Sequence, residues 1–217
     1  MQPAGPVPGR RRAGGPAVTA PDEGWAGVYA REAPPAWDIG RPQAAFTGLA
    51  RRGLLGGRVL DAGCGTGEHT LLAAAHGAEA TGVDLVPLAI ERARAKAAAR
   101  GLTARFEVGD VLDLRALGVS AGTVIDCGVF HVFDDDARAR YVASLAAGLE
   151  PGGTCYLMCF SDLQPGDFGP RRVSQDELRT AFSAGWAIDS IAEETFELNP
   201  RFGVTEARSW LATIRRG

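Results

Sequence analysis

Residues 59–67, with the sequence Val-Leu-Asp-Ala-Gly-Cys-Gly-Thr-Gly, constrain the fold of this chain more than any other feature. A short apolar run ends near an acid and passes into alternating glycines, and a helical pattern follows from Glu68. Glycine adopts positive φ and has no Cβ, so the backbone can turn sharply after a strand and a ligand can approach it closely. These residues therefore predict a strand, a ligand-binding turn and a helix.

The same alternation continues along the chain. Strands are expected at residues 58–61, 80–84, 104–108, 123–126 and 154–160, and helices at residues 68–76, 87–100 and 134–149. A helix over residues 174–184 then leads into two strands, 186–196 and 206–214, joined by a turn at Asn199 and Pro200. Strands that alternate with helices form a parallel sheet. We expect an α/β fold with a Rossmann-like seven-stranded sheet, mostly parallel with a C-terminal antiparallel hairpin, and helices on both faces.

The N-terminal part of the chain differs from the rest. Residues 1–20 are rich in Pro, Gly, Ala and Arg without periodicity, which predicts a disordered tail. A helix is expected after Asp22 and ends before Pro34, and a second helix is expected over residues 42–52. We therefore expect a single domain over residues 21–217, with a helical cap over about residues 21–55.

Composition excludes several classes of function. Apolar residues make up 46% and charged residues 23% of the 217 residues, as in an ordinary globular domain. The formal net charge of -3 gives no general attraction to polyanions, so we expect a small-molecule partner and no nucleic acid. No apolar run suits a membrane span or a signal peptide, so a cytoplasmic location is expected. The four cysteines show no Cys-x-x-Cys spacing, and no metal site is expected.

Acids follow several of the predicted strands, where ligands bind in sheets of this kind. Asp84 ends the second strand, at the distance from Gly63 where a ribose-binding carboxylate is expected. Asp110 follows the third strand and Asp126 ends the fourth. Glu68 stands where the strict dinucleotide fingerprint has its third glycine, and an acid there disfavours a pyrophosphate. A cofactor with a sulfonium and an amino group fits better.

In these features the chain closely resembles class I S-adenosylmethionine-dependent methyltransferases. The resemblance rests on residues 61–67, Asp84, residues 109–111, Asp126 and residues 149–153, which fall in the family's order. It implies that S-adenosylmethionine is the cofactor. It also implies a set of cofactor-binding positions: Gly63, Gly65 and Gly67 at the methionine moiety, Asp84 at the ribose, Asp110 and Val111 at the adenine, and in addition Asp61 and Asp126.

A finer resemblance lies in residues 37–43, Trp-Asp-Ile-Gly-Arg-Pro-Gln, which are similar to the thiopurine, thiol and halide methyltransferase group and to related bacterial small-molecule methyltransferases. The resemblance implies that the N-terminal segment caps the cofactor and that Trp37 forms an aromatic wall beside it. Residues 127–131, Cys-Gly-Val-Phe-His, depart from the arginine-containing sequence of the thiopurine enzymes, which argues against thiopurine specificity.

Methyl transfer depends mainly on alignment of donor and acceptor, and a phenol or hydroxyl acceptor benefits from a general base. His131 is the histidine best placed for that role, because it lies just beyond the fourth strand; a packing role is its alternative. Phe130, Phe168 and Arg171 are expected to contact the acceptor, the last two from the long loop at residues 161–172. His69 and His76 are interpreted as packing or surface residues on the first sheet-flanking helix, with a place near the cofactor as the alternative for His69.

Two other functions stay open at this stage. One is an NAD(P)-dependent Rossmann oxidoreductase, which the glycine pattern disfavours. The other is a non-catalytic S-adenosylmethionine-binding module. The sequence does not distinguish among a thiol, a halide, a phenol or quinol and a natural product as the acceptor. It does not determine the oligomeric state.

Overall fold

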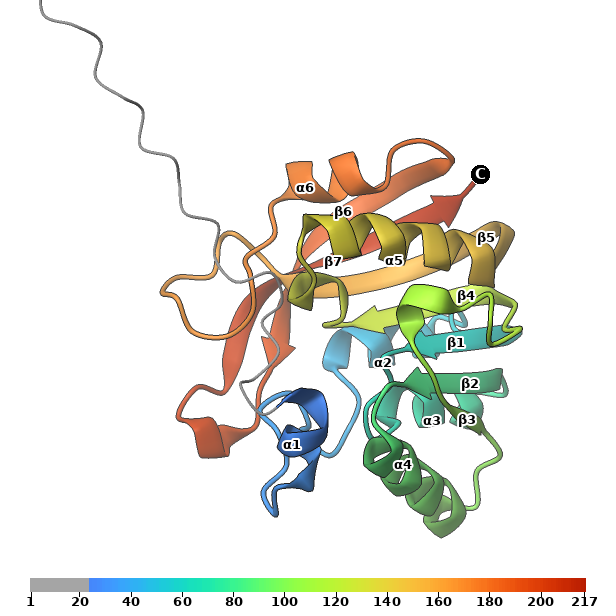
Figure 1. Ribbon diagram of the computed structural model, residues 1–217, viewed down its shortest axis with the longest axis vertical. Helices are drawn as coiled ribbons and strands as arrows, with labels where there is room; N and C mark the ends of the chain where they lie inside the picture. The colour runs from blue at the N-terminus through green and yellow to red at the C-terminus, as the bar shows by residue number, and fades with distance from the viewer. Residues whose placement is uncertain (1–23) are drawn as a thin grey trace, which may run out of the picture.

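A computed structural model describes residues 24–217 as a twisted sheet covered by helices on both faces (Figure 1). The sheet has seven strands in the order β3-β2-β1-β4-β5-β7-β6. Strands β1 to β5 are parallel, and β7 runs antiparallel to both β5 and β6. This topology confirms the predicted fold class. The tail predicted for residues 1–20 lies outside the described residues.

The elements follow the predicted order. The strands are β1 (Arg58–Ala62), β2 (Glu79–Asp84), β3 (Arg105–Val108), β4 (Ala121–Cys127), β5 (Leu149–Phe160), β6 (Trp186–Glu197) and β7 (Glu206–Arg216). The helices are α1 (Gly24–Ala30), α2 (Ala44–Arg51), α3 (Glu68–Ala75), α4 (Pro87–Arg100), α5 (Asp135–Gly148) and α6 (Gln175–Ala181). Short 3-10 helices occur at Val111–Asp113 (η1), Phe130–Val132 (η2) and Pro200–Phe202 (η3).

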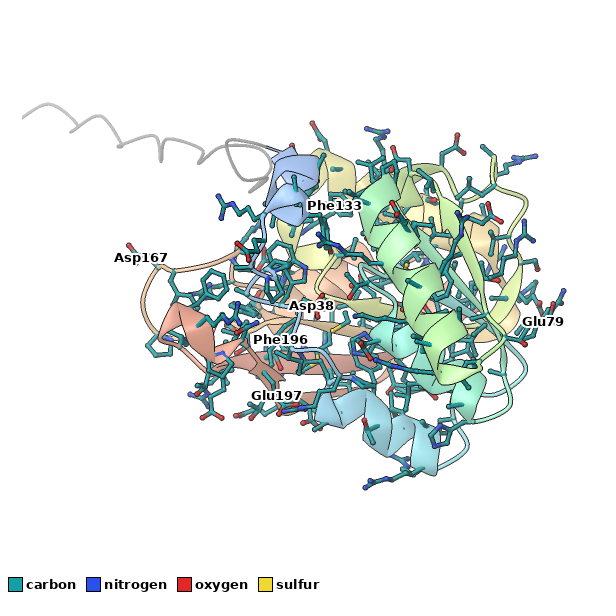
Figure 2. The ribbon with its side chains drawn as sticks, turned by 90° about the horizontal axis from the view of Figure 1, so that it is seen from below. Asp38, Glu79, Phe133, Asp167, Phe196 and Glu197 are labelled. Carbon is teal, nitrogen blue, oxygen red and sulfur yellow. The ribbon has the colours of Figure 1, made fainter. Side chains whose placement is uncertain are left out.

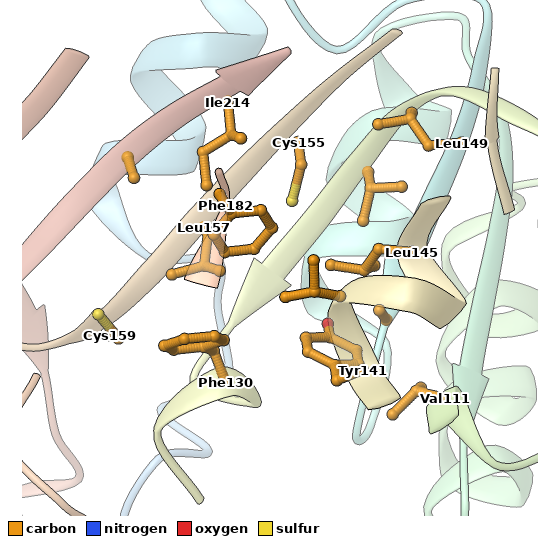
Figure 3. Close-up of a cluster of buried hydrophobic side chains, with 14 of the residues drawn as sticks. Val111, Phe130, Tyr141, Leu145, Leu149, Cys155, Leu157, Cys159, Phe182 and Ile214 are labelled. Carbon is orange, nitrogen blue, oxygen red and sulfur yellow. The ribbon is translucent and has the colours of Figure 1, made fainter. Parts of the chain in front are cut away.

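Two hydrophobic layers sandwich the sheet, because successive strand residues point to opposite faces. On β1, Leu60 packs into the layer that contains α5 and α6, whereas Val59 packs into the layer that contains α2 and α3. Figure 3 shows the first layer, in which Phe130, Tyr141 and other side chains lie over the buried side chains of β5. Of the helices in residues 24–217, none has the length and apolarity needed to cross a membrane.

Local capping signals explain where the best-predicted helices begin and end. Pro87 opens α4 and Gly101 ends it at φ +63°, a left-handed conformation that glycine adopts without strain. Asp134 caps α5 by accepting a hydrogen bond from the backbone N–H of Ala137. Ser174 and Glu177 form a capping box at the start of α6.

The structure departs from the predicted elements most clearly at three places. Helix α6 ends at Ala181 rather than at residue 184, because Phe182 leaves helical geometry and is buried against Phe130 and Trp186. Strand β5 begins at Leu149, before the Pro-Gly-Gly turn that was expected to precede it, with an irregularity in its pairing to β4. The 3-10 turns η1 and η2 follow β3 and β4, where connections without regular structure were expected.

The order of the strands positions the site. From β1 the chain adds β2 and β3 on one side of the sheet and then returns to add β4 on the other side of β1. The carboxyl ends of β1, β2 and β4 lie at one edge. Ligands of open α/β sheets bind at such a switch point. Helix α1 and residues 31–43 lie over this edge and form the cap (Figure 1).

Gly82 in β2 tests how tightly the sheet packs on α3. A Cβ at this position would lie 2.6 Å from Thr70 Oγ1 and 2.8 Å from Cys64 Sγ. We expect Gly82→Ala to lower the free energy of unfolding by about 1–3 kcal/mol through overpacking, measured by urea denaturation. Gly122→Ala in β4 is the matched control, since its Cβ would meet only Glu150 Oε2 at 4.0 Å. Equal effects of the two substitutions would contradict this account of the packing.

Candidate active site

A cavity of about 640 Å³ opens at the carboxyl edge of the sheet. Its walls come from the glycine turn after β1, the ends of β2 and β4, the start of η1, the cap and the C-terminal hairpin. Figure 2 shows Asp38, Phe196 and Glu197 on this side of the molecule, while Glu79, at the start of β2, lies at the opposite end of the sheet. The cavity therefore lies where the switch point of the sheet predicts a ligand.

The glycine turn supplies backbone rather than side chains to the cavity. Gly63 and Gly65 line it at φ +70° and +53°. A Cβ on Gly63 would lie 2.3 Å from Val129 Cγ2, and one on Gly65 would lie 2.8 Å from Tyr29 Oη. These two positions can hold no larger residue, so a ligand meets the bare backbone here.

Gly67 has a different role from the other two glycines. It lies at φ +87° and is not among the lining residues; a Cβ there would lie 2.8 Å from both Ala93 Cβ and Phe106 Cε1. Its small size lets α3 pack closely against α4 and β3. Gly67 therefore shapes the turn from the core side, and the structure does not place it in contact with a bound ligand.

Asp84 faces the cavity from the end of β2. Its Oδ2 accepts a hydrogen bond from the N–H of Gly65 at 2.8 Å, and its Oδ1 accepts one from the N–H of Val86 at 2.9 Å. Burial raises the pKa of this carboxyl, and the two backbone hydrogen bonds oppose the increase. A carboxylate has about four lone-pair sites, so Asp84 can accept two further hydrogen bonds from a ligand diol.

Asp61 and Asp126 are buried beneath the cavity and are not among its lining residues. Asp61 accepts hydrogen bonds from the N–H and Oγ1 of Thr70, at 2.9 and 2.7 Å, and so fixes α3 relative to β1. Asp126 accepts hydrogen bonds from the N–H groups of Val129 and Phe130, at 2.8 and 3.1 Å, and so shapes the turn into η2. Burial raises the pKa of each carboxyl to about 7. These acids position the binding loops.

The segment after β3 forms one side of the cavity. Asp110 and Val111 both line it, together with Leu85 and Val129. Asp110 Oδ1 accepts a hydrogen bond from the N–H of Leu112 at 2.8 Å, which caps η1 and holds Val111 in place. An apolar slot with an acid at its edge suits a planar base with an amino group.

The cap is held by a chain of charged and polar side chains that we call the cap latch: Asp38, Thr66, Glu68, Lys96 and Arg100. Thr66 Oγ1 donates to Asp38 Oδ2 at 2.7 Å and accepts from Lys96 Nζ at 2.6 Å. Lys96 and Arg100 both donate to Glu68, which is 7% exposed. Burial alone would raise the pKa of Glu68, but the hydrogen bonds from Arg100 and Lys96 lower it overall, so the carboxyl is charged.

A second set of contacts ties the cap to the C-terminal hairpin. The Gln43 side chain exchanges two hydrogen bonds with the backbone of Glu197, at 2.9 and 2.8 Å. Arg41 pairs with the Glu197 carboxylate at 2.7 Å, and the N–H of Asn199 donates to the Ala36 carbonyl at 2.7 Å. Trp37 Nε1 donates to Tyr29 Oη at 3.2 Å inside the cap. The cap is therefore anchored at both ends of the cavity.

Aromatic side chains make the wall opposite the glycine turn. We define this aromatic wall as His131, Phe160, Phe168 and Phe196, all of which line the cavity. The ring centroids of His131 and Phe160 are 5.2 Å apart, those of Phe160 and Phe196 are 5.3 Å apart, and those of Phe160 and Phe168 are 6.2 Å apart. Such edge-to-face packing makes a stiff apolar surface.

A family model described as "Methyltransferase domain" matches residues 59–153. The 2-heptyl-1-hydroxyquinolin-4(1H)-one methyltransferase of Mycobacteroides abscessus is 36% identical in an alignment 173 positions long, which covers 76% of this chain and 76% of that protein. The chain belongs to the S-adenosylmethionine-dependent methyltransferases. It is a class I enzyme that acts on small molecules, as the resemblance implied.

Solved structures share this fold. A structure described as "Conversion of a Disulfide Bond into a Thioacetal Group during Echinomycin Biosynthesis" matches with a TM-score of 0.76 and 40% identity, covering 84% of this chain and 85% of that one. Magnesium protoporphyrin IX methyltransferase from Synechocystis PCC 6803, solved with bound S-adenosylmethionine, shares the fold at a TM-score of 0.62 and 21% identity, covering 80% of this chain and 77% of that one.

The residues of the methyltransferase cavity fit S-adenosylmethionine. The bare backbone at Gly63 and Gly65 leaves room for the methionine moiety, Asp84 can accept hydrogen bonds from a ribose diol, and the slot at Val111 suits the adenine. The acids near the glycine turn favour a positively charged sulfonium and disfavour a pyrophosphate. Membership of the methyltransferase family rules out the oxidoreductase alternative, and the relative from Mycobacteroides abscessus is an enzyme, not a non-catalytic binding module.

The structure does not bring all the predicted site residues to the cavity. Trp37, Gly63, Gly65, Asp84, Asp110, Val111, His131 and Phe168 line it, whereas Asp61, Gly67, Asp126, Phe130 and Arg171 do not. Phe130 is fully buried, with the Arg138 guanidinium 4.5 Å above its ring, so it belongs to the core. Arg171 is held outside the cavity by Asp135, at 2.6 Å, and by Glu177. Neither residue lies on the wall of the cavity, because their contacts hold them elsewhere.

Sequence reasoning missed several lining residues. A place near the cofactor was only the alternative interpretation of His69, yet this residue lines the cavity, where its Nε2 accepts a hydrogen bond from the N–H of Gln43 at 3.1 Å. Burial lowers the pKa of His69 to about 4, so the ring is neutral. Asp38 and Thr66 also line the cavity and were not predicted, although they follow Trp37 and Gly65 directly in the sequence. Among residues 24–217, no cluster of three or more metal-ligating side chains occurs.

The cap latch predicts a specific effect on affinity. Thr66→Val keeps the side-chain shape but removes the hydroxyl that joins Lys96 to Asp38. We expect the Kd for S-adenosylhomocysteine to rise about tenfold, measured by calorimetry, because the cap closes less favourably over the bound product. Thr103→Val, at an exposed position after α4, is the control and should bind as the parent enzyme does. Equal affinity of all three proteins would show that the latch does not contribute to binding.

Proposed function

We propose that this enzyme methylates an acidic hydroxyl or a sulfur atom on a flat, apolar ring acceptor. The observation that carries the proposal is the aromatic wall, which combines three phenylalanine rings with a neutral imidazole. A ring-shaped acceptor can stack on this surface, and small polar acceptors find few partners there. The named relative from Mycobacteroides abscessus, whose substrate is a hydroxyquinolone, supports an acceptor of this shape.

The state of His131 determines what the acceptor must supply. Its Nδ1 accepts a hydrogen bond from the backbone N–H of Phe160 at 3.0 Å. Burial lowers the pKa of His131 to about 3, with the charges of Arg138 and Arg172 adding to the shift and a hydrogen bond at the Gly128 backbone opposing it. Because Nδ1 is the acceptor, the neutral ring carries its proton on Nε2. The lone pair that a general base needs is already used, which disfavours the base role predicted for His131.

An acceptor that ionises on its own removes the need for a base. Its anion and the sulfonium neutralise each other as the methyl group moves, and a dry apolar wall strengthens their attraction. An N-hydroxyl on a heteroaromatic ring and an aromatic thiol both meet this requirement. The main demand on the protein is then alignment of the two reactants.

A neutral sulfur is the second candidate acceptor, because it needs no deprotonation at all. The structural neighbour concerned with conversion of a disulfide into a thioacetal, at 40% identity, favours it. A methyl-transfer screen separates the two candidates: 2-heptyl-1-hydroxyquinolin-4(1H)-one and thiophenol represent acidic ring acceptors, an aryl disulfide represents neutral sulfur, and iodide is the small control. Turnover of iodide alone would contradict both candidates.

The pH dependence of the reaction tests the role of His131. We expect kcat/KM to rise with pH around the pKa of each acceptor and to shift when the acceptor is changed. No inflection should occur near the ordinary histidine value of about 6.5, since His131 stays neutral above pH of about 3. The contrary result is an inflection near pH 6.5 that is the same for all acceptors and disappears in His131→Gln.

Three broader expectations belong to the same proposal. We infer that residues 21–217 act as a single domain, that the enzyme works in the cytoplasm, and that nucleic acid is not among its partners. The net charge of -3 and the small-molecule character of its relatives support the last of these.

A further inference from the structure

The loop between β5 and α6, residues 161–173, forms one side of the aromatic wall, and we call it the acceptor loop. Its two ends are fastened together: Ser161 and Val173 form a β-bridge, the N–H of Val173 donates to Phe160 O at 3.0 Å, and the N–H of Asp162 donates to Val173 O at 3.0 Å. A loop closed in this way keeps its shape only if its own groups fill its interior.

The guanidinium of Arg172 lies inside this loop and bonds to its backbone at four positions. Its four hydrogen bonds all go to backbone carbonyls of the loop: Gln164 O at 3.3 Å, Gly166 O at 3.3 Å, Phe168 O at 2.7 Å and Pro170 O at 2.7 Å. These bonds use most of the five N–H donors of an arginine side chain. The loop segment has no regular secondary structure, so its backbone carbonyls lack partners in a helix or sheet. The Arg172 side chain supplies hydrogen-bond donors to four of them.

The same guanidinium reaches the aromatic wall. It lies 5.4 Å from the ring centroid of Phe160 and 5.4 Å from that of Phe168. The loop backbone lies close to the first ring, since a Cβ on Gly169 would be 3.2 Å from Phe160 Cε2. Phe168, Gly169 and Pro170 line the cavity, so the position of Arg172 fixes the position of this part of the wall.

We propose that Arg172 is a positioning residue that sets acceptor specificity by holding the acceptor loop against Phe160. The proposal rests on the proposed function, because it takes the aromatic wall to be the surface that binds the acceptor ring. It assigns the organising role to Arg172 instead of Arg171, whose guanidinium pairs with Asp135 and Glu177 outside the cavity.

Geometry rather than charge carries this role. Lysine keeps the positive charge but offers one ammonium group in place of a planar fork, so it cannot reach four carbonyls that surround the side chain. Arg172→Lys therefore tests the fork directly. The matched control is Arg179→Lys on α6, an exposed arginine whose partners, Gln175 and Asp176, lie on its own helix.

The first measurement is hydrogen exchange of the backbone amides by mass spectrometry on the full chain without ligands. We expect amides of residues 161–171 to exchange at least about tenfold faster in Arg172→Lys than in the parent enzyme, while the rest of the sheet is unchanged. Arg179→Lys should match the parent enzyme. Unchanged exchange in the loop, or a loss of protection across the whole sheet, would overturn the proposal.

The second measurement is steady-state kinetics with ring acceptors and with iodide or methanethiol as small acceptors. In Arg172→Lys the KM for a ring acceptor should rise about tenfold, while S-adenosylhomocysteine affinity and turnover of small acceptors change little. An equal loss with ring and small acceptors would overturn the specificity role. If the parent enzyme methylates no ring acceptor, the proposed function fails, and hydrogen exchange still decides whether Arg172 holds the loop.

Discussion

The hydrogen bond from the N–H of Gly65 to Asp84 is the interaction on which the rest of the site depends. It joins the turn after β1 to the end of β2, so the two strands present a ligand-binding surface in a fixed relative position. Asp61 adds a second tie by fixing the start of α3 through Thr70. Because Gly63 and Gly65 have no room for a Cβ, the surface is made of backbone, and Asp84 provides its charge.

The remaining walls are supported by long-range contacts. The cap reaches across the glycine turn because Thr66 lies between Asp38 and the ammonium of Lys96. Asp126 holds the turn that carries His131, whose ring in turn accepts the N–H of Phe160 at the end of β5. The glycine turn and the aromatic wall are thus connected through hydrogen bonds between side chains and backbone N–H groups at the carboxyl ends of β1, β4 and β5. The hydrogen bonds that stabilise the fold at this edge therefore also fix the walls of the cavity.

The sequence was sufficient for the fold because its signals are local. Helix α4 was predicted to the residue, since Pro87 and Gly101 mark its two ends, and the glycine turn was recognised from spacing alone. Gly63, Gly65, Asp84, Asp110 and Val111 all line the cavity, because topology brings the ends of parallel strands to one edge.

The parts that were missed depend on contacts between distant residues. Thr66 and Lys96 are 30 positions apart, and no local pattern indicates that they meet. Arg171 and Arg172 are neighbours with the same chemistry, yet one faces Asp135 and Glu177 and the other fills the acceptor loop. Whether Phe130 enters the cavity or the core likewise depends on which side of η2 it occupies. Such choices are decided by packing.

Calorimetric titration of S-adenosylhomocysteine into the parent enzyme and into Asp84→Asn, with NADH as the control ligand, tests the central claim most directly. Asparagine keeps the shape of Asp84 but loses the charge and one hydrogen-bond acceptor. The account predicts that the parent enzyme binds S-adenosylhomocysteine and not NADH, and that folded Asp84→Asn, which loses one of the two backbone hydrogen bonds to Gly65 and Val86 together with the charge, binds it at least about tenfold more weakly. Equal binding by both proteins would contradict the assignment of Asp84 and of the cavity around it.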